Sequence, residues 1–306
     1  MRGAIILVGL VVLAPLGCGE GEKKPRDRDE FTVQVEDPAG APLAGAAVTT
    51  EPATQAVTSG TDGRAVFLDL EPGPYLFRAS LAGRQPKTIS VVVPDGDAST
   101  TLPLVSTDGL VAWYPFDGDG TDAAGDHDAT AVDASPAPDR FGRAGLAYAF
   151  DGATDHLTVP GFFSETTAQL TLAAWVKPTT ISGEHCVLYN LEKAEVGLYL
   201  QADRITYFFR TDVSSGFGSW SDPVVTAGAW QHVALTRAGG AMTAYHDGAA
   251  ARSIDTEYVG AYGFTGMPGA IGYLPDGRNF FEGAMEDVQV YSRPLSAAEI
   301  EALARR

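Results

Sequence analysis

Five aspartates in residues 117–128 form the densest group of side chains that could bind a metal ion. Lys and Arg are absent from this interval, which contains Asp117, Asp119, Asp122, Asp126 and Asp128. Carboxylates this close repel one another unless a cation or water screens them. Ca²⁺ takes about 6–8 oxygen ligands of this kind. The spacing is not that of an EF-hand loop, so a calcium site and a solvated acidic loop both stay open.

Aromatic residues beside glycines and serines provide a second candidate site, for carbohydrate. Phe217 and Trp220 lie in a Gly/Ser-rich segment, and Arg210 and Tyr262 belong to neighbouring aromatic segments. Carbohydrate sites combine aromatic faces with polar groups in a concave surface. Aromatic residues also fill the cores of β proteins, so core packing is the alternative. Three further tryptophans lie inside predicted strands and are expected in the core: Trp113, Trp175 and Trp230.

The motifs of common enzyme classes are absent. The sequence has no G-x-S-x-G, no P-loop, no glycine-rich dinucleotide fingerprint and no HExxH zinc motif. A glycoside hydrolase needs two carboxyl groups that face one cleft, and the nearest such pair is Glu282 with Glu286. We therefore expect no catalytic site and no enzyme activity. A secreted glycoside hydrolase remains the alternative.

Composition limits the partners and the architecture. The chain has 306 residues and a formal net charge of −18, of which −13 falls in residues 109–306. Such a polyanion does not attract nucleic acid or anionic lipid by general electrostatics. The 35 glycines and 19 prolines favour short strands joined by turns. The length favours two domains.

The N-terminus has the pattern of an export signal. Met1-Arg2 is followed by an apolar run over residues 4–16 and then by Gly17-Cys18. This ending resembles the lipobox of bacterial lipoproteins, which implies a signal peptide over residues 1–17 and a lipid on Cys18. An ordinary cleaved signal is the alternative. Residues 18–30 are polar and are expected to form a flexible tether. The resemblance implies a cell-envelope protein that is periplasmic or surface-exposed and is held to the membrane by its lipid alone.

Residues 31–105 alternate apolar and polar positions in short segments bounded by Gly, Pro and Asp. This pattern predicts a small Greek-key β-sandwich. Three successive motifs, DPAGAPLAGA at 37–46, TDGRAVF at 61–67 and LEPGPY at 70–75, resemble the carboxypeptidase regulatory-like, transthyretin-like domain. The resemblance implies a spacer or adhesion module without peptidase activity.

Residues 109–306 continue with β segments and end in a helix with a capping box at Ser296 and Glu299. Successive motifs resemble a bacterial laminin-G-like, concanavalin A-like domain: GLVAWYPFDG at 109–118, YAFDG at 148–152, LAAWVKP at 172–178, WQHVALTR at 230–237, YHDG at 245–248 and FEGAMEDVQVYSRPLS at 281–296. The expected fold class is therefore all-β, with the small sandwich followed by a two-sheet jelly roll and a short C-terminal helix.

The resemblance also gives the acidic residues a role. Proteins of this fold often hold calcium between the loop after the first strand and the last strand. The matching positions are Asp117 and Asp122, with Glu286 or Asp287 across the sheet. The resemblance thus implies a lipid-anchored binding or adhesion protein that recognises carbohydrate or a cell-surface protein. A non-binding structural protein of the cell envelope is a further alternative.

Overall fold

The structure is a computed structural model of the chain, and it describes all residues except 1–28, 160–168, 191–193, 212–216, 256–268 and 275–276. Strands dominate the described part, and the short helix α1 (Ala297–Ala304) lies near the C-terminus. The predicted all-β fold class is confirmed. No helix in the described ranges is long and apolar enough to cross a membrane.

The N-terminal domain is a sandwich of two small sheets, with strand orders β4-β1-β7 and β3-β2-β5-β6. Its strands are β1 (Glu30–Glu36), β2 (Ala47–Glu51), β3 (Val57–Thr58), β4 (Arg64–Leu68), β5 (Gly73–Ser80), β6 (Lys87–Val93) and β7 (Ala98–Pro103). The alternating positions Phe31, Val33 and Val35 are buried in the core, as a strand with one face on a core requires. Phe31 also stacks on Phe77 across the sandwich, with ring centroids 5.0 Å apart.

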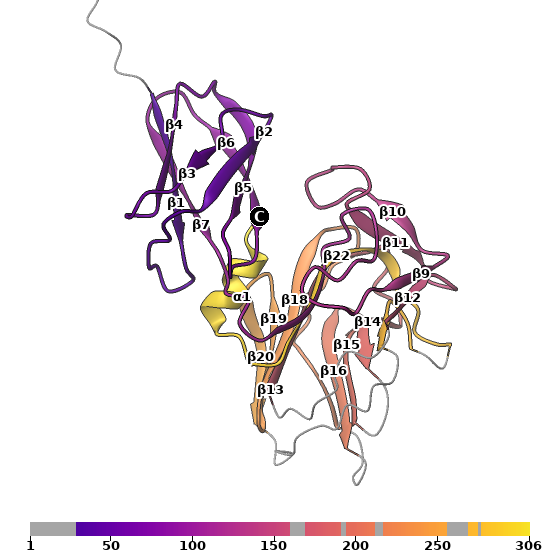
Figure 1. Cartoon of the computed structure of the whole chain (residues 1–306). Coiled ribbons are helices and arrows are strands. Elements are labelled where there is room, and N and C mark those ends of the chain that lie inside the picture. Colours follow the sequence, from indigo (N-terminus) through magenta and orange to yellow (C-terminus); the bar gives the residue numbers. More distant parts are fainter. Residues whose placement is uncertain (1–28, 160–168, 191–193, 212–216, 256–268, 275–276) are drawn as a thin grey trace, which may run out of the picture.

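The C-terminal domain contains a larger pair of sheets (Figure 1). One sheet has the order β10-β11-β22-β13-β18-β19-β20, and β8 also pairs with β22. Its strands are β8 (Leu110–Tyr114), β10 (Ser135–Ala137), β11 (Ala147–Asp151), β13 (Gln169–Pro178), β18 (Gln231–Ala238), β19 (Ala241–His246), β20 (Ala249–Asp255) and β22 (Glu282–Tyr291). We call it the β13 sheet.

The second sheet has the order β17-β16-β15-β14-β21-β12-β9. Its strands are β9 (Thr130–Val132), β12 (His156–Val159), β14 (Glu184–Asn190), β15 (Ala194–Gln201), β16 (Arg204–Thr211), β17 (Phe217–Trp220) and β21 (Gly269–Ile271). Leu172, Ala174 and Val176 of β13 belong to the core of this domain. Because side chains alternate along a strand, Trp175 and Lys177 point to the opposite, outer face of the β13 sheet.

Helix α1 covers part of this outer face. The predicted capping box is confirmed: the Ser296 hydroxyl accepts the Glu299 N–H, and the Glu299 carboxylate accepts the Ser296 N–H. Ile300 and Leu303 pack in one apolar cluster with Ala173 and Ala234 of the β13 sheet. Val105, from the segment that joins the domains, belongs to the same cluster. Figure 1 shows α1 between the two domains, so the helix contributes to their junction.

Candidate functional site

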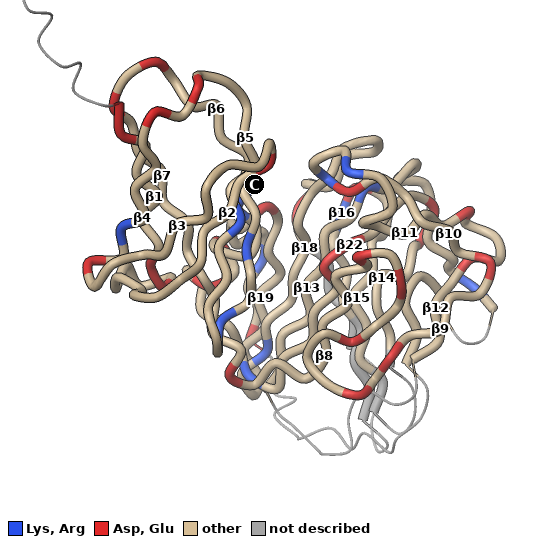
Figure 2. The backbone as a smooth tube through the Cα atoms, turned by 45° about the horizontal axis from the view of Figure 1, so that its top comes forward, with Lys and Arg blue, Asp and Glu red and all other residues tan. Residues whose placement is uncertain are grey.

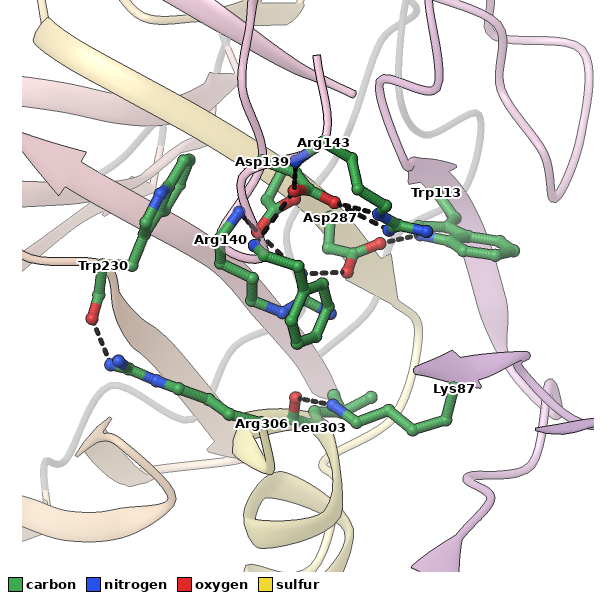
Figure 3. Close-up of polar contacts among 11 residues, drawn as sticks. Lys87, Trp113, Asp139, Arg140, Arg143, Trp230, Asp287, Leu303 and Arg306 are labelled. Atoms are coloured by element: carbon green, nitrogen blue, oxygen red, sulfur yellow. Dashed lines mark hydrogen bonds and ion pairs between the residues drawn. The ribbon is translucent and has the colours of Figure 1, made fainter. Parts of the chain in front are cut away.

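The predicted carboxylates on β22 meet a guanidinium. Arg140 Nη1 donates to Glu286 Oε1 at 2.8 Å and to Asp287 Oδ2 at 2.8 Å. The Arg140 N–H also donates to Glu286, and Trp113 Nε1 donates to Asp287 Oδ1 at 3.0 Å. Figure 3 shows these groups converging from three separate parts of the domain. We call Arg140, Glu286 and Asp287 the ion-pair cluster. The positive charge in this cluster is the Arg140 guanidinium.

Burial and pairing shift the pKa values within this cluster. Burial opposes the charge on Arg140, but Asp287 and Glu286 outweigh it, so the Arg140 pKa is raised. Burial raises the pKa of Glu286 to about 7, although Arg140 acts in the opposite direction. Burial also acts to raise the pKa of Asp287, but Arg140 and the Trp113 hydrogen bond reverse the outcome and lower it. Asp287 is therefore the more firmly ionised partner of the guanidinium.

Lys87 of the N-terminal domain lies beside this cluster. Its Nζ donates to the carbonyl oxygen of Leu303, in the last turn of α1, at 2.6 Å (Figure 3). A cation at a helix C-terminus interacts favourably with the helix dipole. Burial nevertheless lowers the pKa of Lys87 to about 7, with nearby Arg140 acting in the same direction. The contact ties the small sandwich directly to α1.

Neither Asp122 nor Asp117 is bonded to the ion-pair cluster. Asp122 is 4% exposed, and its carboxylate accepts the N–H groups of Trp113, Ala124 and His127. It therefore holds its own loop against β8. Asp117 is exposed over part of its surface, and the burial of the remainder, together with the charge of Asp287, raises its pKa. Figure 2 shows acidic residues in loops of both domains.

The predicted calcium ligands do not form a calcium cage in this arrangement. The carboxylate of Asp122 is occupied by backbone N–H groups, and those of Glu286 and Asp287 face Arg140. Calcium needs about 6–8 oxygen ligands around one point. Among the described residues, no three His, Cys, Asp or Glu side chains are grouped so that they could hold a metal ion. Calcium binding stays a prediction from the sequence.

The aromatic site predicted from the sequence falls largely outside the described residues. Tyr262 lies in the range 256–268, which the structure does not describe. Arg210 lies in β16, and Phe217 and Trp220 lie in β17, which pairs with β16 through Phe209↔Phe217 and Thr206↔Trp220. Only the backbone of these three residues is described. A ligand site at these side chains therefore stays a prediction.

The three tryptophans expected in the core differ from one another. Trp175 is 1% exposed, so that prediction is confirmed. Its ring contacts two cations, with the Arg140 and Arg306 guanidinium carbons 4.8 and 5.0 Å from its centroid. For Trp113 and Trp230 the prediction is wrong because both side chains are only partly buried. Trp230 immediately precedes β18, where the chain enters the sheet, and its side chain lines a groove.

This groove lies on the outer face of the β13 sheet and has a volume of about 730 Å³. We call it the Trp230 groove. Two cross-strand residue pairs run across its floor, Ala149↔Ala284 and Lys177↔Ala284. On the other side of β13, Val176 pairs with Gln231, the residue that follows Trp230. Small side chains on β11 and β22 thus leave the floor open, and the groove continues to Lys177 and Trp230.

The loop that carries Asp139 and Arg140 forms a wall of the groove. Asp139 is 3% exposed, and its carboxylate accepts two backbone N–H groups and the Arg143 side chain, with an ion-pair distance of 2.7 Å. Arg140 is held by the ion-pair cluster. Lys177 is exposed and forms no ion pair with a described residue. The loop is therefore held in place by these bonds, whereas the Lys177 side chain is exposed to solvent.

Gly283 explains how closely the strands approach below the groove. Its φ is +144°, and a Cβ there would lie 2.2 Å from the Lys177 carbonyl oxygen and 2.8 Å from Pro178 Cα. Any other residue would push β22 away from the end of β13. The groove was not predicted from the sequence because its lining residues come from five separate segments. Ala149 and Ala284 lie within the motifs at 148–152 and 281–296, but those motifs do not show that the two residues pair across neighbouring strands.

Comparison with known families accounts for both domains. Residues 30–105 match the carboxypeptidase regulatory-like domain, and residues 151–301 match the concanavalin A-like lectin/glucanases superfamily. The two matched regions follow one another along the chain, the first in the N-terminal domain and the second in the C-terminal domain. Both family resemblances seen in the sequence are thereby confirmed. No curated protein matches the chain.

Solved structures share the fold at low sequence identity. Domain 4 of AbnA, a GH43 extracellular arabinanase from Geobacillus stearothermophilus, in complex with arabinotriose, has a TM-score of 0.53 and 17% identity, covering 64% of this chain and 98% of that structure. The ligand-binding domain of botulinum neurotoxin serotype D, in complex with N-acetylneuraminic acid, has a TM-score of 0.54 and 14% identity. The match covers 65% of this chain and only 51% of the toxin structure. At these identities the likenesses show a shared fold alone.

Proposed function

We propose that this protein is a lipid-anchored binding protein of the cell envelope whose concanavalin A-like domain recognises carbohydrate in the Trp230 groove. The family match supports ligand binding at the level of the domain. Two solved structures of this fold hold sugars, arabinotriose in one and N-acetylneuraminic acid in the other. The groove supplies a specific place for such a ligand on this chain.

The observation that carries the proposal is the open Trp230 side chain beside Lys177. An indole face stacks on the apolar face of a sugar ring, and an ammonium donates hydrogen bonds to its oxygens. Ligand pockets typically measure about 300–1,000 Å³, and the groove, at about 730 Å³, lies within that range. Asp139, Arg140 and Thr179 border the same space. One to a few sugar units fit these dimensions and this chemistry.

We further propose that the protein binds sugar without hydrolysing it. Glu286 is 3% exposed and paired with Arg140, so it does not face a substrate. Four residues of extended strand separate its Cα from that of Glu282 by about 13 Å. Glycosidases place their two carboxyl groups about 5–9.5 Å apart. Within the groove, Asp139 is occupied by Arg143 and backbone donors.

The membrane anchor is a separate part of the proposal and rests on the Leu16-Gly17-Cys18 pattern. Expression in a bacterium with radiolabelled palmitate tests it. We expect label on the wild-type protein and none on Cys18→Ser, with Cys186→Ser as the matched control. Label that persists on Cys18→Ser would overturn lipid attachment at Cys18.

A glycan array tests carbohydrate binding. We expect the purified soluble chain to bind a subset of glycans, Trp230→Ala to lose them and Trp230→Phe to retain part of the signal. The array is repeated with a chelator to test calcium, and the bound glycans are incubated with the protein to detect cleavage products. Cleavage would support the glycosidase alternative. Glycan binding that Trp230→Ala leaves intact would overturn the groove as the site. The absence of any glycan binding would overturn carbohydrate recognition in favour of a protein ligand or a structural role.

A further inference from the structure

The charged side chains around the Trp230 groove differ in whether an oppositely charged side chain neutralises them. Three charged side chains line it: Asp139, Arg140 and Lys177. Arg143 neutralises Asp139, and Glu286 and Asp287 neutralise Arg140. Of the described residues that line the groove, Lys177 alone carries a charge with no oppositely charged partner. The groove therefore presents one uncompensated positive charge on a chain whose net charge is −18.

The register places this charge beside the aromatic surface. Val176 pairs with Gln231, and the Gly228 N–H donates to the Pro178 carbonyl oxygen at 2.7 Å, so the segment that carries Trp230 runs beside the end of β13. Lys177 and Trp230 both line the groove. On its other side Lys177 faces Ala284, whose small side chain leaves room above the floor. A ring stacked on Trp230 thus carries its substituents within reach of the Lys177 ammonium.

We infer that the groove selects a sugar that bears a carboxylate, such as a hexuronate, with its ring against Trp230 and its carboxylate on the Lys177 ammonium. This inference rests on the proposed carbohydrate binding and adds the charge of the ligand. An ammonium–carboxylate hydrogen bond is about twice as strong as a neutral one. A neutral hydroxyl at the same place would leave the positive charge of Lys177 uncompensated.

The net charge of the protein restricts the kind of acidic glycan. The concanavalin A-like segment, residues 109–306, carries −13, which disfavours a densely charged polymer through general repulsion. At physiological salt the Debye length is about 8 Å, so a single carboxylate inside the groove responds mainly to Lys177. The expected ligand is therefore a largely neutral glycan with isolated uronate residues.

The test uses acidic oligosaccharides in matched pairs, each as the natural uronate and as its carboxyl-reduced neutral form, bound to the purified soluble chain. Reduction changes the carboxylate to a hydroxymethyl group and leaves the rest of the glycan intact. We expect wild type to prefer the uronate by about tenfold or more, the difference that one charge-assisted contact supplies. Lys177→Gln should lose this preference while keeping its affinity for the neutral form, and Lys177→Arg should retain much of it. Arg252→Gln, the same charge change at an exposed position on β20, is the control.

The outcomes separate this inference from the proposed function. Equal, Trp230-dependent binding of both members of each pair would overturn the uronate preference and leave carbohydrate binding intact. A uronate preference that persists in Lys177→Gln would overturn the role of Lys177. If no glycan in the paired set or the array binds in a Trp230-dependent way, both the inference and the proposed groove are overturned.

Discussion

Two neighbouring rows of side chains on the outer face of the β13 sheet have opposite properties. The first row crosses the strands as His232, Trp175 and Glu286, and Arg140 covers it. The second row lies two residues further along β13 and contains Lys177 and Ala284. In the first row the charges are buried and paired, whereas in the second Lys177 is exposed and forms no ion pair with a residue that the structure describes. The clustered charges of the first row therefore stabilise the fold. The candidate site lies where Lys177, which has no described counter-charge, borders the same groove as the partly exposed Trp230.

Replacing Arg140 should have the largest effect on the first row. Arg140→Met removes the guanidinium that pairs with both Glu286 and Asp287. Removing one partner of a buried pair costs about 3–5 kcal/mol. Urea denaturation of Arg140→Met and of the exposed control Arg252→Met measures the difference in the free energy of unfolding. A loss below about 1 kcal/mol, or full recovery on adding calcium, would show that Arg140 is not what neutralises these carboxylates.

Gly283→Ala should cause the next largest loss of stability. Gly283 lies on β22 directly after the Glu282 end, where the strand approaches Lys177 and Pro178 of β13. The new Cβ meets the Lys177 carbonyl oxygen and forces β22 away from β13. We expect a loss of about 2–4 kcal/mol in the free energy of unfolding. Gly142→Ala is the matched control, because Gly142 also lines the groove with a positive φ but has open space around it, and it should cost about 1–2 kcal/mol. Equal losses in thermal or urea denaturation would contradict the close approach of the strands.

Lys87 should give the junction beside the first row a measurable pH dependence. Burial lowers its pKa from 10.5 to about 7 in the folded protein. Between these values the unfolded chain binds more protons than the folded chain, so this residue makes stability rise with pH above about 7. A Lys87 variant keeps all the charged groups that act on Lys87, which are Arg140, Asp287, Glu286 and Arg305.

Urea denaturation at pH 7 and pH 9 checks this. The wild-type midpoint should rise relative to that of Lys87→Met as the pH increases. Lys177→Met, which removes an exposed lysine, should follow the wild type. The same pH dependence in wild type and Lys87→Met would show that Lys87 is not buried at the domain junction.

Calcium should produce the smallest change. Arg140 already neutralises Glu286 and Asp287, and backbone donors occupy Asp122. We therefore expect no shift in the melting temperature of the soluble chain on adding calcium or a chelator, measured by scanning fluorimetry. A calcium-dependent increase that Asp117→Asn and Asp122→Asn abolish would support the site predicted from the sequence and contradict this expectation.

The sequence predicted the fold well because local patterns decide it. Alternation over residues 31–35 and 170–176, turn residues between strands and the capping box at Ser296 are all short-range signals, and each corresponds to the observed element. The candidate site depends on long-range register instead. Arg140 reaches Glu286 across 146 positions of sequence, and Lys177 and Trp230 line one groove only because β13 pairs with β18. The acidic motif was visible in the sequence, but its counter-ion, an arginine in a distant loop, was not.

Tryptophan indole signals offer the most direct test of the central claim, that the Trp230 groove binds carbohydrate. The chain has four tryptophans, at positions 113, 175, 220 and 230, so ¹⁵N-tryptophan labelling gives four signals that single substitutions can assign. The labelled protein is titrated with glycans selected by the array. We predict that the Trp230 signal shifts with saturation while those of Trp113, Trp175 and Trp220 stay in place. A saturable shift confined to Trp220, or binding that leaves Trp230 unchanged, would contradict the account.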